Sequence, residues 1–147
     1  WMVVPDAMVP VVERLAQNLF ICASTISQHA ALACFEPESI AEYERRRAEF
    51  KARRDYFIPE LNKLGLSVPV MPDGAFYAWA DCTQVAHRLG VDGSWDFAFE
   101  LMRRAHLAIT PGRDFGTADT ARHVRFSTAN SMAQLQEAVS RLQRLIG

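Results

Sequence analysis

A helical repeat that runs without a break from residue 37 to residue 64 constrains the fold more than any other feature. Its members are spaced three and four residues apart: Ile40, Tyr43, Arg47, Phe50, Arg54, Phe57, Leu61 and Leu64. This is the period of a helix with one buried stripe. Pro37 suits a first helical turn, Pro59 should kink or interrupt the last turns, and Gly65 should end the helix. A helix this long in a chain of 147 residues is expected to tie two structural units together.

Short strand-like segments follow this helix. Residues 66–70 and residues 75–80 flank a turn signal at Asp73-Gly74, and together they predict a β-hairpin. Residues 107–109 predict a further strand. Residues 110–116 then predict a loop whose two glycines allow close approach of the backbone to a ligand.

Helical periods also precede and follow these strands. Their expected N-caps, in chain order, are Asp6, Ser24, Ser94 and Ser131. Ser131 and Gln134 have the spacing of a capping box. The order of elements predicts an α+β fold (α/β, two layers), with a small, mainly antiparallel sheet and helices packed on one face.

Composition and charge exclude several classes of protein. Half of the residues are hydrophobic, 22% are charged and the net charge is −1, which argues against a nucleic-acid-binding protein. No apolar run is long enough for a membrane span, and no signal peptide is visible. Three cysteines without a CxxC pair indicate a reducing compartment, so we expect a cytoplasmic protein. His29 has no companion ligand, and we expect it to be structural rather than part of a metal site.

The first residues predict a strand that is already under way. Residues 1–5 read Trp-Met-Val-Val-Pro, and such a two-sided apolar strand normally lies inside a sheet. Nothing before it supplies neighbouring strands. It either pairs with a later strand, or the chain is the tail of a longer one, and we expect the latter.

Arg125 lies in the middle of a predicted strand. Val124 and Phe126 alternate with His123, Arg125 and Ser127, as in a strand with one buried face. Arg125 therefore points away from the core. The planar fork of a guanidinium fixed on a strand matches the two oxygens of a carboxylate. The alternative is a solvated arginine on an exposed sheet face.

Three motifs, taken in order, resemble one family. They are Gly74-Ala75-Phe76-Tyr77, then Ile109-Thr110-Pro111-Gly112 with Phe115-Gly116, and finally Val124-Arg125-Phe126-Ser127. The series is similar to the C-terminal part of a class I/II aminotransferase, in the aspartate-aminotransferase-like group of fold type I pyridoxal-phosphate enzymes. The resemblance covers essentially the whole chain. It implies that residues 1–36 are the tail end of the large cofactor-binding domain and that residues 37–147 form the C-terminal small domain.

The resemblance also implies roles for individual residues. Arg125 matches the arginine that holds the α-carboxylate of the substrate. Phe76 and Tyr77 match a strand near the substrate entrance, although both could simply be core aromatics of a hairpin. Ser24 and Thr25 match a loop that approaches the active site of a partner subunit, which implies a homodimer. The implied substrates are an amino acid and a 2-oxo acid.

One departure from the family pattern concerns the cofactor. These enzymes need a lysine that forms a Schiff base with pyridoxal phosphate. The only lysines are Lys51 and Lys63, both in the charged long helix. The resemblance therefore implies pyridoxal phosphate in a parent enzyme, and a chain that binds none and does not transaminate alone. Two alternatives are a free-standing binding or interaction module with the same fold, and an unrelated α+β domain.

Overall fold

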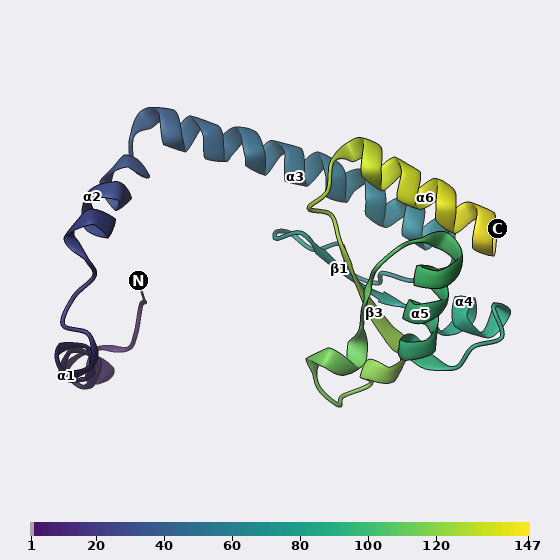
Figure 1. Ribbon diagram of the computed structural model, residues 1–147, viewed down its shortest axis with the longest axis horizontal. Coiled ribbons are helices and arrows are strands. Elements are labelled where there is room, and N and C mark those ends of the chain that lie inside the picture. The colour runs from purple at the N-terminus through teal and green to yellow at the C-terminus, as the bar shows by residue number, and fades with distance from the viewer. Residues whose placement is uncertain (1) are drawn as a thin grey trace. The chain divides into compact units, whose positions relative to one another are not determined.

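The computed structural model describes residues 2–147. The chain divides into two compact units, one up to Arg45 and one from Arg46 to Gly147, and each is described by itself (Figure 1). In the part of the chain that the structure describes, no helix is long and apolar enough to cross a membrane.

The unit up to Arg45 consists of helices. It contains a 3-10 helix η1 (Asp6–Met8), α1 (Val9–Leu19), α2 (Thr25–Ala33) and the beginning of α3 (Pro37–Lys63). The strand predicted at the start is wrong for residues 2–5, which form no regular structure, and Trp1 lies outside the described residues. Among the described residues of this unit, no strand offers a ladder of backbone hydrogen bonds, and an isolated strand is not stable without one.

Capping of these first helices is partly as predicted. Ser24 is the N-cap of α2, and its side chain accepts a hydrogen bond from the amide of Ser27. Asp6 is not a cap: it lies inside η1, and Met8 stands at the N-cap position of α1. Pro10, in the first turn of α1, needs no amide partner there.

The long helix is confirmed. Helix α3 ends at Lys63, and Gly65 follows with a φ of +88°, a left-handed conformation that favours glycine. The interruption expected at Pro59 does not occur, because α3 continues through that residue. Of the apolar stripe, only Phe57 and Leu61 are fully buried, together with the neighbouring Ile58.

The sheet has three antiparallel strands in the order β1-β3-β2. They are β1 (Tyr77–Asp81), β2 (Thr110–Pro111) and β3 (His123–Ser127). The predicted hairpin is wrong: β1 pairs with β3, and residues 66–70 supply only a single bridge, from Ser67 to Asp81. Pro69 removes an amide donor from that segment, and Pro72 follows it. The predicted strand at residues 107–109 is displaced to β2.

Three further helices complete the second unit: α4 (Thr83–Arg88), α5 (Gly93–Ala105) and α6 (Met132–Ile146). The capping box of Ser131 and Gln134 is confirmed. Ser94 is not a cap. It lies inside α5, is buried, and donates to the carbonyl of Thr120 at 3.3 Å.

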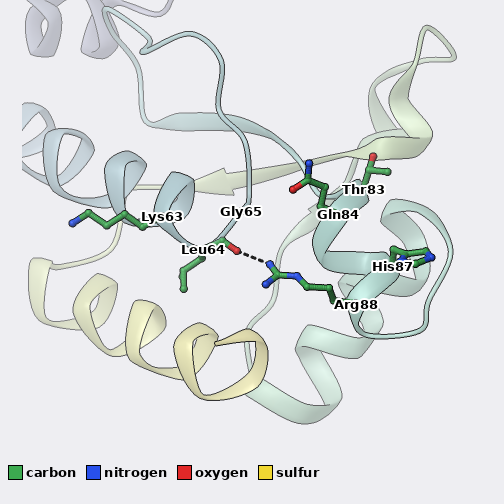
Figure 2. Close-up of a pocket in the computed structure, with 7 residues that line it drawn as sticks. All are labelled: Lys63, Leu64, Gly65, Thr83, Gln84, His87 and Arg88. Atoms are coloured by element: carbon green, nitrogen blue, oxygen red, sulfur yellow. Dashed lines mark hydrogen bonds between the residues drawn. The ribbon is translucent and has the colours of Figure 1, made fainter.

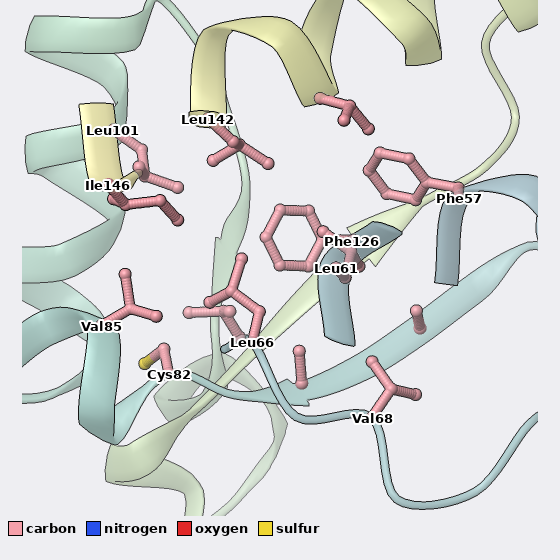
Figure 3. Close-up of a cluster of buried hydrophobic side chains, with 14 of the residues drawn as sticks. Phe57, Leu61, Leu66, Val68, Cys82, Val85, Leu101, Phe126, Leu142 and Ile146 are labelled. Carbon is pink, nitrogen blue, oxygen red and sulfur yellow. The ribbon is translucent and has the colours of Figure 1, made fainter. Parts of the chain in front are cut away.

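The hydrophobic core lies between one face of the sheet and the helices. Val124 and Phe126 of β3 belong to the same buried cluster as side chains of α3, α4, α5 and α6. Figure 3 shows Leu61 of α3 and Leu142 of α6 in this cluster beside Phe126. The predicted small antiparallel sheet with helices on one face is confirmed. Arg125 lies between Val124 and Phe126 in β3, so its side chain points to the opposite face of the sheet.

Candidate functional site

The functional candidate lies on the face of the sheet that points away from the core. Trp79 of β1 and Arg125 of β3 are directly paired there. Tyr77 is two residues from Trp79 and so shares its face. Phe115, at the end of the 3-10 helix η2 (Gly112–Phe115), also contacts this face. Three segments far apart in the sequence therefore meet around Arg125.

The Arg125 guanidinium contacts two aromatic rings. Its Cζ atom lies 4.1 Å from the ring centre of Tyr77 and 4.6 Å from that of Phe115. Both distances are within the range of cation–π attraction. On β2, the Oγ1 atom of Thr110 accepts a hydrogen bond of 3.4 Å from Nη2. The rings attract the charge through their faces, and the N–H groups radiate from the edge of the guanidinium plane.

Arg125 has no acidic partner within residues 2–147. Its recorded contacts are the two rings and the Thr110 hydroxyl. Several other arginines of the second unit are paired with carboxylates, as Arg122 is with Asp81 and Arg141 with Glu137. A half-buried cation without a counter-ion is suited to bind an anion from outside the chain.

A second layer of aromatic contacts supports Phe115. The Phe115 ring meets Trp79 edge-on at 5.5 Å, and Trp79 stacks on the His123 ring at 5.4 Å and 13°. The Nδ1 atom of His123 lies 2.8 Å from the carbonyl oxygen of Asp119, which can only accept, so Nδ1 donates. Packing against Trp79, which itself stacks on His123, holds the Phe115 ring in place.

The residues predicted beside Arg125 fall into two groups. Tyr77 and Phe76 are in the same unit as Arg125, with ring centres 4.4 Å apart. They are 40% and 37% exposed and stand outside the core cluster, so the alternative of core aromatics is wrong. Ser24 and Thr25 belong to the other unit, where Ser24 caps α2. Their role at a partner's active site stays a prediction.

Sequence reasoning missed three contributors to the site: Thr110, Phe115 and Trp79. Thr110 and Phe115 stand in the motifs that carry the family resemblance, but nothing in their local pattern shows that they contact Arg125. Trp79 had a readable signal. It follows Tyr77 by two residues on a strand, and this spacing places both on one face.

The end of the same two strands holds a structural ion pair. Arg122 donates to the Asp81 carboxylate through Nε and Nη2, and the Thr83 amide donates to it at 2.9 Å. Burial on its own would raise the pKa of Asp81, but the hydrogen bonds from Arg122 and Thr83 outweigh it and lower the pKa from 3.8 to about 2. The pair ties β1 to the turn before β3.

A hollow elsewhere in the second unit does not offer a comparable site. It has a volume of about 640 Å³ and is lined by the end of α3 and by α4 (Figure 2). Arg88 in this hollow donates to the Leu64 carbonyl at 2.9 Å, and Lys63 pairs with Glu60 at 2.6 Å. Both cations are thus engaged by the chain itself.

The residues present do not fit a Schiff-base site for pyridoxal phosphate. Such a lysine needs a buried pocket that favours its uncharged form. Lys51 pairs with Asp55 at 2.6 Å and has a side chain 62% exposed, and the Lys63 side chain is 69% exposed. Neither lysine has the surroundings that the cofactor chemistry requires.

Comparisons with known proteins agree with this architecture. The family model of aminotransferase class I and II matches residues 1–142. The chain is 32% identical over 142 residues to a valine–pyruvate aminotransferase of Mycobacterium tuberculosis, covering 97% of the chain and 35% of that protein. It is 34% identical to a (5-formylfuran-3-yl)methyl phosphate transaminase of Methanocaldococcus jannaschii, covering 96% of the chain and 35% of that protein.

A solved structure shares the fold. A crystal structure of an aminotransferase from Mycobacterium tuberculosis matches with a TM-score of 0.87 and 32% identity, over 99% of this chain and 36% of that one. The chain spans only about a third of the length of these relatives. The order of the motifs, the fold and the family model agree over nearly all of its residues. This chain therefore belongs to the class I and II aminotransferases.

Proposed function

We propose that this chain supplies the carboxylate-binding part of an aminotransferase that moves an amino group between an amino acid and a 2-oxo acid. The observation that carries the proposal is the state of Arg125: a guanidinium in contact with the Tyr77 and Phe115 rings, with no carboxylate partner in residues 2–147. An amino acid and a 2-oxo acid both carry a carboxylate next to the reacting carbon. One arginine therefore serves both substrates.

The role of Arg125 is orientation and charge balance. Two parallel N–H groups on one edge of the guanidinium can bind both oxygens of a carboxylate. Such a bidentate contact fixes the direction of the bond to the α-carbon, and correct orientation lowers the entropic cost of reaction. Tyr77, which contacts Arg125, and the neighbouring Phe76 are partly exposed and form the expected substrate entrance.

The rest of the active site is proposed to come from outside these residues. Pyridoxal phosphate supplies the electron sink of transamination, and neither Lys51 nor Lys63 suits its attachment. We therefore expect no transamination by this chain alone, and we place the enzyme in the cytoplasm on its cysteine usage.

Residues 1–36 are proposed to belong to the large, cofactor-binding domain. Helices α1 and α2 have no buried side chain, and large apolar residues such as Leu15, Leu19 and Ile26 are exposed. Exposed apolar faces of this kind mark surfaces that other protein covers. The same argument supports a homodimer in which Ser24 and Thr25 approach the partner's site.

The central experiment replaces Arg125 in a holoenzyme that contains this chain. Arg125→Gln should lower kcat/KM for amino acid and 2-oxo acid by about tenfold to a hundredfold, the range of a lost charge-assisted hydrogen bond. The matched control is Arg103→Gln, which removes the same charge from α5, where Arg103 pairs with Glu100. Equal kinetics for the two variants would remove Arg125 from substrate binding.

A second experiment tests whether the isolated chain carries the cofactor chemistry. The purified chain is mixed with pyridoxal phosphate, reduced with borohydride and examined by mass spectrometry for a lysine adduct. We expect no stoichiometric adduct at either lysine. A specific adduct at Lys51 or Lys63 would contradict the proposal that the cofactor site lies outside these residues.

A further inference from the structure

We infer that Phe115 is a positioning residue for Arg125: its ring, 4.6 Å from the Cζ atom, restricts the guanidinium to the orientation in which it meets a substrate carboxylate. This inference rests on the function proposed above. It concerns the loop that carries Phe115, and it assigns that loop a part in substrate orientation.

The two rings that contact Arg125 come from different kinds of structure. Tyr77 pairs with Ser127 across the sheet, so it is a diagonal neighbour of Arg125 on the same face. Its position follows from the register of β1 and β3. Phe115 belongs to no strand, and η2 brings its ring to 4.6 Å from the Cζ atom of Arg125. Both rings contact the guanidinium only while this short helix stays in place.

Close backbone packing holds η2 against β3. A Cβ atom on Gly112 would lie 2.2 Å from the Thr120 carbonyl oxygen and 2.5 Å from that of His123. The backbone at the beginning of η2 thus packs closely against the backbone of the 3-10 helix η3 (Thr120–Arg122) and of His123, the first residue of β3. Thr120 also donates from its hydroxyl to the Gly116 carbonyl at 2.8 Å. Phe115 therefore belongs to a segment whose two ends, Gly112 and Gly116, both contact Thr120.

Apart from its contacts with the two rings, the guanidinium makes a weak hydrogen bond. The hydrogen bond to Thr110 measures 3.4 Å, which is long for an N–H···O contact. A free arginine side chain loses considerable rotamer entropy when it is fixed. With two rings in contact with the guanidinium, part of that cost is met on folding and not on substrate binding, which is preorganisation.

The direct test observes Arg125 in the 147-residue chain by ¹⁵N NMR. In the wild type, the Nε–H order parameter of Arg125 should be close to that of the backbone. Phe115→Leu should lower it to the values of an exposed side chain, and Phe115→Tyr should restore it. The control is Phe99→Leu on α5, since Phe99 is 42% exposed and Phe115 46%, and Phe99 contacts Trp95 instead. An unchanged order parameter in Phe115→Leu would overturn the inference.

Kinetics of a holoenzyme that contains this chain give the second readout. Phe115→Leu should raise KM for both substrates by about fivefold, the scale of one cation–π contact, with kcat within twofold of the wild type. Phe99→Leu should change neither constant. If Arg125→Gln raises KM and Phe115→Leu behaves like Phe99→Leu, the inference fails and the proposed function stands. If Arg125→Gln itself has no effect, the proposed function fails.

Discussion

Replacement of Gly112 by alanine tests the close contact between η2 and β3. The new Cβ would lie 2.2 Å and 2.5 Å from two carbonyl oxygens. Both are backbone atoms, so no side chain can rotate away to relieve the clash. Overpacking a tight site costs about 1–3 kcal/mol and sometimes more, and a rigid backbone neighbour places this variant at about 3 kcal/mol.

The matched control is Gly74→Ala. A Cβ on Gly74 would meet nothing within 4 Å, and its φ lies outside the left-handed range. Alanine should be neutral there, or stabilising by about 0.4–1 kcal/mol because the unfolded chain loses freedom. The two variants make the same chemical change and differ only in their surroundings.

Thermal unfolding followed by circular dichroism compares the two variants. A loss of about 3 kcal/mol should lower Tm by roughly 6–12 °C in a chain of this size. Urea unfolding gives the same difference at 25 °C, and the ¹⁵N signal of Arg125 reports whether the loop has moved. If Gly112→Ala unfolds at the temperature of Gly74→Ala, the backbone contact between η2 and β3 does not exist as described.

Three further outcomes are expected. The pKa of Asp81 is lowered from 3.8 to about 2, so its ion pair stabilises the fold above about pH 4. This contribution is lost as the pH falls toward 2. Asp81→Asn should therefore reduce the change in unfolding free energy between pH 4 and pH 2, measured by urea unfolding. Burial raises the pKa of Cys82 to about 12, so at pH 8 Ellman's reagent should label the exposed Cys22 and Cys34 and reach Cys82 only after denaturation. The buried Thr128 hydroxyl has no hydrogen-bond partner within residues 2–147, so Thr128→Val should keep or raise stability by up to about 1 kcal/mol in urea unfolding, and a clear loss would reveal a partner.

Local patterns predicted the helices better than the strands. Three helical features depend only on residues a few positions apart, and each could be predicted from the sequence. They are the apolar stripe of α3, the end of α3 near Gly65 and the capping box of α6. The pairing of β1 was not readable, because its partner lies beyond α5 in the sequence. The adjacent 66–70 segment is the nearer candidate partner, but Pro69 removes one of its amide donors.

The candidate site shows the same division between local and distant information. Arg125 was identified from strand alternation and from its motif. Phe115 was quoted in a motif, but its contact with Arg125 depends on how η2 folds back over the sheet. No periodicity or spacing in the sequence predicts that η2 folds back over the sheet. The same holds for Ser94, which fits a cap by its residue type and is instead bonded to the Thr120 carbonyl.

The strand order β1-β3-β2 has a consequence for synthesis on the ribosome. The central strand, β3, is the last of the three in the chain, so β1 and β2 have no sheet partner until β3 leaves the exit tunnel. At ~5–20 residues per second, β1 waits several seconds with its strand edges unpaired. When β3 arrives, it brings Arg125 between Tyr77 and Thr110 in the same step that closes the core. Nascent chains stalled before residue 123 should therefore be sensitive to protease and bind chaperones, and those stalled well after α6 should not.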